Sequence, residues 1–371
     1  IINMIQIPKT ELENRNKLLK QSMLKSDVDA VFLPLGIYFQ YYFGKSASPS
    51  ERIILGVIPS EGDPFILTPT FEKSNLMNST YVEDYITWDE TDSPYKKFSK
   101  ELADRNIGSN ILVDPKLWIL EVEKINTYSD LNILSGHDLL KTQREIKSEW
   151  EIKQLKSASK ASAEGILASL PYLKEGITEK EFLPILSDQT RNISNNPLSF
   201  ALIQFGENSS IPHGYPSSKK LKNDNAVLID SGTSINGYQG DITISVPFGE
   251  PKQFEEIYQI VFDANRSALH NGSKNHTGNE LDQLARSYIS KNNYGNYFTH
   301  RLGHGIGLEV HEEPYIVGNN NFHLKIGNCH TIEPGIYLPN KFGIRIEDDV
   351  VVTKNGIELL YDTPRFNFDY N

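Results

Sequence analysis

The stretch His300-Arg-Leu-Gly-His304-Gly-Ile-Gly-Leu-Glu-Val-His311-Glu312 decides the fold, because it sets a histidine among glycines between acids that lie on short apolar runs. Those four acids are Asp230, Asp241, Glu333 and Glu347. Burying an isolated carboxylate costs many kcal/mol, so acids inside apolar runs indicate a nearby counter-charge. Two divalent cations carry four positive charges and match the four carboxylates. The pattern predicts a dinuclear metallohydrolase in which the four acids and His304 form the ligand set.

A hairpin is predicted between the two aspartates of the ligand set. Asn236-Gly237 lies near the midpoint between Asp230 and Asp241, and Asn-Gly is the strongest short signal for a two-residue hairpin turn. We therefore expect the two aspartates to lie nearly opposite each other on neighbouring strands. Strand alternation puts Thr243 on the same face as Asp241.

A second hairpin is predicted between the two glutamates. Glu333 and Glu347 flank Pro339-Asn340-Lys341, which can reverse the chain in the same way. Alternation places Thr331 on the face of Glu333 and Arg345 on the face of Glu347. Each hairpin thus contributes one pair of carboxylates to the predicted site.

The donor atoms of the ligand set indicate which metals to expect. Several carboxylates with one imidazole favour Mn(II) or Co(II), and Zn(II) is possible. A structural zinc site would use cysteines instead. The alternative is that these acids are surface or turn residues, which is the commoner situation for any single aspartate. Five such residues on two hairpins and one glycine-framed segment favour the metal site.

The glycines around His304 admit a second interpretation, a nucleotide-binding loop. Gly303, Gly305 and Gly307 do not have the spacing of the dinucleotide fingerprint, and no Gly-Lys-Ser/Thr follows for a P-loop. We expect instead that they let the backbone pass close to the metals and the substrate.

Size and charge limit the possible partners. At 371 residues the chain is long enough for two domains. Its net charge of -11 argues against nucleic-acid binding, which requires a basic surface. We expect no membrane association, because no apolar run is long enough to span a bilayer. The N-terminal residues also lack the pattern of a secretory signal.

The single cysteine, Cys329, excludes an intramolecular disulfide and indicates a reducing, cytoplasmic setting. The neighbouring His330 raises the possibility of a thiolate–imidazole pair. Because Cys329 directly precedes a predicted strand, a packed thiol is the favoured interpretation.

The chain divides into an α/β N-terminal part, residues 1–140, and a larger part, residues 141–371. Helices are predicted to begin after Thr10, Thr178 and Thr277, because each threonine is followed three residues later by glutamate, as in a capping box. No catalytic constellation is evident in the N-terminal part.

Five segments carry a resemblance to a known family. They are Ile229-Asp-Ser-Gly232, Gly240-Asp-Ile-Thr243, His300 to Glu312, Thr331-Ile-Glu-Pro-Gly-Ile-Tyr337 and Gly343-Ile-Arg-Ile-Glu-Asp348. The chain resembles the Xaa-Pro peptidases, prolidase and aminopeptidase P, which belong to the pita-bread metallopeptidases. The likeness covers most of Ser148–Tyr361 and is weaker over the N-terminal part. Several motifs in the family's order make it specific.

The resemblance implies a fold and a cofactor. Residues 1–140 would form a small creatinase-like α/β domain, and residues 141–371 a pita-bread catalytic domain. The ligand set matches the family's five ligands for two metal ions, and the resemblance implies a homodimer.

The resemblance also implies roles for residues outside the ligand set. His213 and His311 match two family histidines that could hydrogen-bond the developing oxyanion or the substrate. Glu333, besides being a ligand, resembles the residue that transfers a proton to the leaving nitrogen. Independently of the resemblance, Arg345 shares a strand face with Glu347, and its planar guanidinium either clamps the substrate's C-terminal carboxylate or pairs with the acidic ligands; both remain open. His300 is expected to orient neighbouring groups.

One position departs from the family. Many relatives read Asp-x-Thr-Arg-Thr where this chain has Asp241-Ile-Thr-Ile244-Ser245. Ile244 stands where those relatives have a positively charged arginine. Any ion pair that the arginine makes in them is therefore not predicted for this chain.

These observations lead to one expected function and three alternatives. We expect hydrolysis of the peptide bond before proline, with small Xaa-Pro peptides as substrates and Xaa-Pro dipeptidase (prolidase) as the first choice. The close alternative is Xaa-Pro aminopeptidase, which acts on longer peptides. A non-catalytic peptide-binding module is more distant, because the ligand set is intact. Methionine aminopeptidase fits less well, because the N-terminal part is large.

Overall fold

The computed structural model describes residues 7–366, and the chain divides into two compact units between Arg144 and Glu145. The two domain ranges expected from the sequence, 1–140 and 141–371, remain a proposal. No helix among the described residues is long and apolar enough to cross a membrane.

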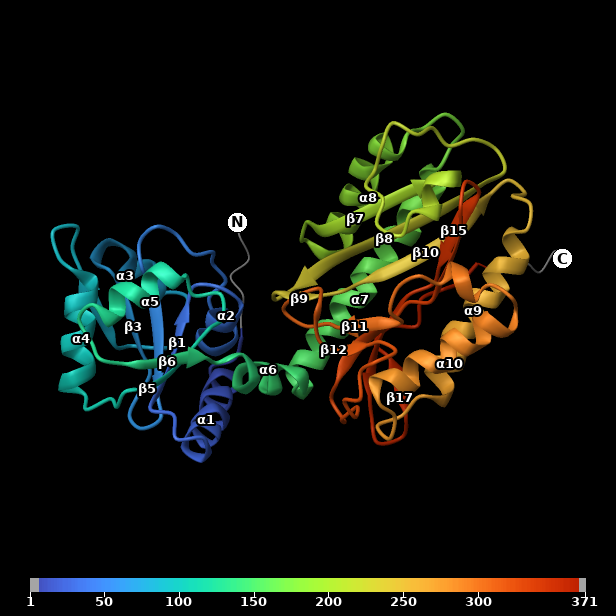
Figure 1. Ribbon diagram of the computed structural model, residues 1–371. Helices are drawn as coiled ribbons and strands as arrows, with labels where there is room; N and C mark the ends of the chain where they lie inside the picture. The colour runs from blue at the N-terminus through green and yellow to red at the C-terminus, as the bar shows by residue number, and fades with distance from the viewer. Residues whose placement is uncertain (1–6, 367–371) are drawn as a thin grey trace. The chain divides into compact units, whose positions relative to one another are not determined.

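The first unit is built on a six-stranded sheet with the strand order β4-β3-β2-β1-β5-β6. Figure 1 shows these strands in the middle of the unit with helices around them. The strands are β1 (Ala30–Pro34), β2 (Leu55–Pro59), β3 (Phe65–Pro69), β4 (Tyr85–Trp88), β5 (Asn110–Val113) and β6 (Asn132–Ser135). The helices are α1 (Lys9–Lys25), α2 (Ile37–Phe43), α3 (Lys73–Met77), α4 (Pro94–Asp104), α5 (Ile119–Asn126) and α6 (His137–Glu145). All residues of β1 to β3 are buried, as expected for their continuous apolar runs.

The prediction that Thr10 caps the first helix is wrong. Helix α1 begins at Lys9 with Pro8 at the N-cap, and no side chain caps it. Proline holds φ near the helical value, here -56°, and can precede or begin a helix at little cost. Thr10 therefore lies inside the first turn.

The second unit has two halves, each with a pair of helices packed on a sheet (Figure 1). In the first half the helices are α7 (Glu149–Ser169) and α8 (Glu179–Ser194). The strands are β7 (Leu198–Phe205), β8 (Asn225–Ile235), β9 (Tyr238–Gln239) and β10 (Ile242–Phe248), in the order β10-β8-β7 with β9 paired to β8. A core that includes Phe182, Phe205 and Ile229 fills the space between helices and sheet.

The second half repeats this arrangement with the remaining elements. Its helices are α9 (Phe254–Asn271) and α10 (Gly278–Lys291). The strands are β11 (Gly303–Gly305), β12 (Glu312–Ile316), β13 (Cys329–Ile332), β14 (Gly335–Leu338), β15 (Phe342–Arg345), β16 (Asp348–Val352) and β17 (Ile357–Leu359). They form the sheet β12-β11-β13-β16-β17 and the hairpin β14-β15. The chain is thus α/β, as expected.

The capping boxes predicted for the second unit are confirmed. The Thr178 side chain accepts from the Glu181 backbone and the Glu181 side chain caps Thr178 in return; Thr277 and Glu280 do the same for α10. These boxes satisfy backbone N–H groups that the first helical turn leaves without partners.

Candidate metal centre

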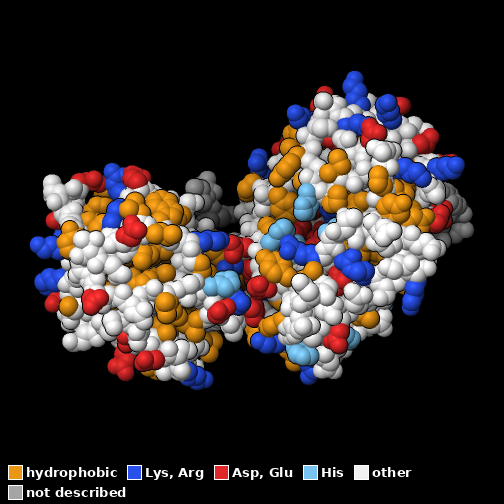
Figure 2. All heavy atoms as spheres, viewed as in Figure 1, with side chains coloured by type: hydrophobic (Ala, Val, Ile, Leu, Met, Phe, Trp, Pro, Cys, Tyr) orange, Lys and Arg blue, Asp and Glu red, His pale blue; other side chains and the backbone are white. Residues whose placement is uncertain are grey.

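All five residues of the ligand set line one cavity of about 920 Å³ in the second unit. Figure 2 shows histidine, basic and acidic side chains gathered around a hollow on this face. The cavity is also lined by residues that the sequence assigned to the site or its surroundings: His213, His300, His311 and Arg345. The structure therefore brings together segments that lie more than a hundred residues apart.

The first hairpin forms as predicted, with a change in register. Asn236 and Gly237 both have positive φ, 50° and 85°, as a two-residue type I′ turn requires. The residue directly opposite Asp230 is Thr243, not Asp241. Asp241 lies two residues before Thr243, so the two aspartates are diagonal neighbours on the same face.

The second hairpin places the two glutamates opposite each other. Strands β14 and β15 pair from Leu338↔Phe342 to Gly335↔Arg345, around the predicted turn. Glu333 and Glu347 lie two residues beyond the last pair on each side, and so continue the same register on the same face.

His304 reaches the site from β11, which is closely packed between two strands. A Cβ at Gly303 would lie 2.0 Å from the carbonyl oxygen of Thr331, and one at Gly305 would lie 2.3 Å from that of Glu313. These glycines therefore permit close approach to neighbouring backbone, and the expected approach to metals and substrate stays a prediction. The His304 backbone N–H donates to Thr331 Oγ1 at 3.1 Å, which helps to fix its position.

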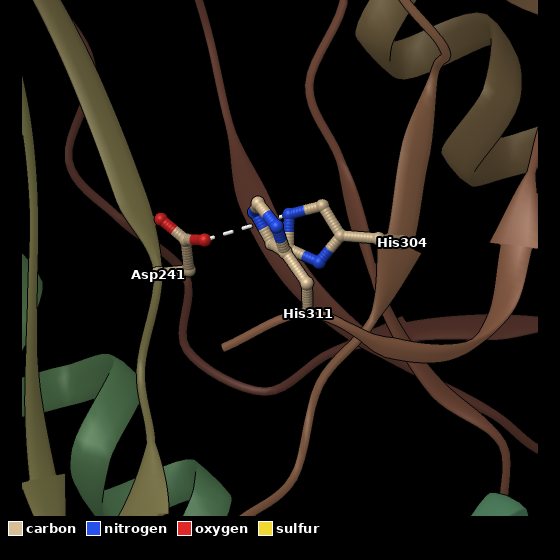
Figure 3. Close-up of side chains that lie close together, drawn as sticks. All are labelled: Asp241, His304 and His311. Carbon is tan, nitrogen blue, oxygen red and sulfur yellow. Dashed lines mark ion pairs between the residues drawn. The ribbon is translucent and has the colours of Figure 1, made fainter. Parts of the chain in front are cut away.

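The side chains form three groups that could each hold a metal ion. In each group the ligand atoms lie within 4.8 Å of one another, and the groups are Asp230–Asp241–Glu347, His304–Glu333–Glu347 and Asp241–His304–His311. The first two together use the whole ligand set and share Glu347. If each of these two groups held an ion, Glu347 would be a ligand common to both sites. Figure 3 shows the third group, with His311 beside His304.

Burial and mutual repulsion act strongly on these acids. Burial, and then the charge of Glu347, raise the pKa of Asp241 well above its ordinary value. Burial, and then Glu333, do the same to the pKa of Glu347. The pKa of Glu333 rises to about 7, mainly through burial, although the positive charge of Arg345 opposes this. The protein thus supplies less positive charge than its carboxylates require.

The residues present fit divalent cations. Asp230 is 7% exposed, and its Oδ1 has no hydrogen-bond partner among the described residues. A buried polar atom without a partner is costly, and a cation beside Asp230 would provide one. Oxygen donors with a single imidazole are the ligands of hard or borderline divalent ions.

The additional histidines surround this group. The His311 ring lies 4.0 Å from that of His304, and burial lowers the pKa of His311. His213 lines the cavity from the loop between β7 and β8. His300 Nε2 lies 2.8 Å from the Tyr337 hydroxyl, and burial lowers the pKa of His300 to about 3, so this imidazole is neutral. Its contacts agree with the orienting role expected for it.

The donors of Arg345 are occupied by protein groups. Its guanidinium donates to Asp230 Oδ2 at 2.5 Å and to Thr243 Oγ1 at 3.0 Å. It also donates to the Tyr337 hydroxyl at 2.8 Å and to the Pro212 carbonyl at 3.2 Å. Of the two roles left open by the sequence, these contacts favour pairing with an acidic ligand. Arg345 as a whole residue is 2% exposed.

Ile244, the position that departs from the family, does not line the cavity. Ile244 is 3% exposed and packs in the apolar core of the first half. Thr243 faces Glu347, to which it donates a hydrogen bond at 2.5 Å. Since strand side chains alternate, Ile244 lies on the opposite face of β10.

Two carboxylates that act on the site were missed from the sequence. Asp349 Oδ2 accepts from the Asp241 backbone N–H at 3.0 Å and from Ser159 Oγ at 2.5 Å, and so positions a ligand. The run Glu347-Asp348-Asp349 inside an apolar strand was the available signal. Glu179 was overlooked because it directly follows the capping threonine.

Glu179 anchors the loop that carries His213. It is fully buried, and it accepts from the Phe205 backbone N–H at 2.8 Å, the Ser217 backbone N–H at 2.8 Å and the Asn208 side chain at 2.9 Å. One carboxylate therefore ties the end of β7 to two residues within this loop. The loop's conformation, and with it the position of His213, depends on Glu179.

We predict that Glu179→Gln lowers kcat by about 10- to 100-fold while metal content stays the same. Both oxygens of the Glu179 carboxylate accept hydrogen bonds, whereas the side-chain amide of glutamine has only one oxygen that can accept. A lost hydrogen bond to a charged group costs about 1.5–3 kcal/mol. The matched control is Glu181→Gln on the same helix, which should affect stability slightly and kcat not at all. Unchanged kcat in a folded Glu179→Gln protein would disprove the anchor's effect on His213.

Comparisons with known proteins agree with this geometry. Residues 153–354 match the model of metallopeptidase family M24, and residues 15–146 match the creatinase/prolidase N-terminal domain. An uncharacterized peptidase of Staphylococcus epidermidis is 34% identical, over 93% of this chain and 97% of the relative. A prolidase structure from Thermococcus sibiricus has a TM-score of 0.87 at 29% identity and covers 95% of this chain and 98% of its own. An X-Pro aminopeptidase structure from Thermotoga maritima has a TM-score of 0.85 at 30% identity and covers 95% of this chain and 99% of its own.

Two helix-covered halves around a buried group of acids and one histidine define a metallopeptidase with the pita-bread fold. The chain belongs to metallopeptidase family M24 and carries the family's creatinase/prolidase N-terminal domain.

Proposed function

We propose that the protein is an Xaa-Pro dipeptidase whose ligand set holds two divalent metal ions. The observation that carries this proposal is the pair of adjacent ligand groups that share Glu347 and line one cavity. We expect Mn(II) or Co(II), with Zn(II) possible, because oxygen donors predominate. When bound, such ions polarise a carbonyl group and make a water molecule more acidic.

The protein's own groups provide the proton transfers. Glu333 lies beside His304, with Oε1 3.3 Å from the imidazole Nε2, and a carboxylate at this place can accept a proton from water and donate it again. The prolyl nitrogen is a tertiary amide and must gain a proton as it leaves. Glu333 takes a proton from water and gives it to that nitrogen.

His311 and His213 stabilise the charge that develops on the scissile carbonyl. Both histidines line the cavity, and neither belongs to the two groups of residues that make up the ligand set. A hydrogen-bond donor directed at a developing oxyanion stabilises the negative charge of the transition state. His311 lies next to His304 and is placed to donate near the metal ligands.

Xaa-Pro aminopeptidase activity is the second candidate. It is favoured by the similarity to the Thermotoga maritima X-Pro aminopeptidase, whose TM-score and identity nearly equal those of the Thermococcus sibiricus prolidase. The two activities share their chemistry and differ in the length of peptide that fits beyond proline.

We predict that chelation abolishes cleavage of Ala-Pro and that added Mn(II) or Co(II) restores it. Hydrolysis of Ala-Pro and Ala-Pro-Ala should be compared before and after metal addition, with the metal content of the protein measured in parallel. Faster cleavage of the dipeptide supports dipeptidase, and faster cleavage of the tripeptide supports aminopeptidase. If the metal-loaded protein cleaves neither, the proline-peptidase proposal fails and a peptide-binding role gains weight.

We further propose that the protein is a cytoplasmic homodimer without nucleic-acid or membrane partners. The net charge of -11 argues against a nucleic-acid partner. The single cysteine is compatible with the reducing cytoplasm. The thiol of Cys329 is buried, and burial raises its pKa to about 12, so it is not a nucleophile.

A further inference from the structure

A dipeptidase must recognise the free carboxylate that follows proline, and Arg345 is not available to do so. Its guanidinium is engaged by Asp230, Thr243, Tyr337 and the Pro212 carbonyl. Moving it to a substrate would break all four of these hydrogen bonds, and a metal ion beside Asp230 would not replace those to Thr243, Tyr337 and Pro212, which opposes substrate binding.

Arg301 is the other permanently charged cation among the described residues that line the cavity. Its guanidinium makes no hydrogen bond or ion pair with any residue of the described range 7–366. Its carbon Cζ lies 4.5 Å from the centre of the Tyr315 ring. Stacking on an aromatic face fixes the plane of a guanidinium and leaves its N–H groups free at the edge.

Arg301 is also close to the reacting groups. It lies in the segment that leads into His304, and His300 Nδ1 contacts its backbone carbonyl at 2.7 Å. Its positive charge acts on His311 strongly enough to add to the effect of burial in lowering the pKa of that imidazole. The free guanidinium therefore faces the same cavity as the ligand set and His311.

We propose that Arg301, held against the ring of Tyr315, binds the C-terminal carboxylate of the substrate and so makes the site selective for Xaa-Pro dipeptides. This rests on the proposed function. A planar guanidinium binds a carboxylate through two parallel hydrogen bonds. One additional residue moves the carboxylate by about 3.5 Å, so a tripeptide cannot place its scissile bond at the ligand set and its carboxylate at Arg301 together.

The test compares Ala-Pro, Ala-Pro amide and Glu-Pro as substrates of the metal-loaded full chain. In the unaltered protein, KM for the amide should exceed KM for Ala-Pro by about 10- to 100-fold, the range for a hydrogen bond to a charged group. Arg301→Gln should raise KM for Ala-Pro to the level of the amide and leave kcat little changed. Arg191→Gln, at an exposed position of α8, is the matched control and should change neither.

The stacking partner provides a second pair of variants. Tyr315→Phe keeps the ring and should retain the preference for the free carboxylate, whereas Tyr315→Leu should reduce it. A preference that survives Arg301→Gln would overturn the proposal. So would a loss confined to Glu-Pro, because Arg301 would then recognise the first residue of the substrate.

A binding measurement separates this proposal from the proposed function. L-Proline should raise the Tm of the metal-loaded protein more than L-prolinamide does, and Arg301→Gln should remove that difference. If the protein cleaves no Xaa-Pro peptide but this difference depends on Arg301, the proposed function fails and the carboxylate site stands. Equal effects of the two ligands on the unaltered protein would reject the site.

Discussion

Glu347→Gln is expected to lower kcat/KM for Ala-Pro by about 1,000-fold and to remove at least one metal ion per chain. Glu347 is the residue common to the groups Asp230–Asp241–Glu347 and His304–Glu333–Glu347. Loss of a group that merely orients a metal ligand costs about 10- to 100-fold, so loss of a shared carboxylate should cost more. Metal content and kcat/KM measured on the same preparation test this directly.

The same substitution should stabilise the metal-free protein. Burial, and then Glu333, raise the pKa of Glu347 in the folded state above its unfolded value. A carboxyl group of this kind opposes folding at pH values above the unfolded pKa, and the penalty grows as pH rises. Neutral glutamine removes the penalty at pH 7. A metal ligand should therefore show a loss of activity together with a gain in the stability of the metal-free protein. Substitution of an ordinary core residue would lower both.

The control for this pair of measurements is Glu250→Gln, at an exposed position of the same unit. It removes one carboxylate without touching the cavity, so metal content, activity and metal-free stability should all stay near their original values. Unchanged metal content in Glu347→Gln would contradict the assignment of Glu347.

Local signals in the sequence predict much of the second unit correctly. Thr178 and Thr277 begin helices as capping boxes, and Asn236-Gly237 turns the first hairpin, because a few neighbouring residues determine these features. Thr10 shows the limit of such signals. The same threonine–glutamate spacing is present there, but Pro8 begins the helix earlier.

The ligand set could be recognised because acids on apolar runs conflict with burial unless a cation is present. The partners of Arg345 could not be predicted in the same way. Asp230 lies 115 residues before it, and their contact depends on how the two halves pack. Asn208 and Ser217 likewise meet Glu179 through the path of a loop, for which no periodic pattern exists.

Arg345→Met is expected to destabilise the metal-free protein by about 3–5 kcal/mol, the cost of removing one partner from a buried ion pair. Asp230 would lose its cation, and the Thr243 and Tyr337 hydroxyls would lose their donor. Urea unfolding of the chelated protein measures the effect. Arg345→Lys is the matched control, since it keeps the charge but not the planar fork, and its loss should be smaller.

The metal-loaded protein provides the decisive comparison. If the ions supply the positive charge that the acids require, then bound metal should reduce the destabilisation caused by Arg345→Met. The loss in the chelated protein should also grow as pH rises, because the charge of Arg345 lowers the pKa of Glu333 and of Glu347. Without Arg345 these raised pKa values rise further, and ionisation of the two groups opposes folding more strongly. An equal loss with and without metal, at every pH, would show that Arg345 acts through packing alone. A smaller loss with metal bound, together with a loss that grows with pH in the chelated protein, would establish that the guanidinium and the metal ions balance the same buried carboxylates.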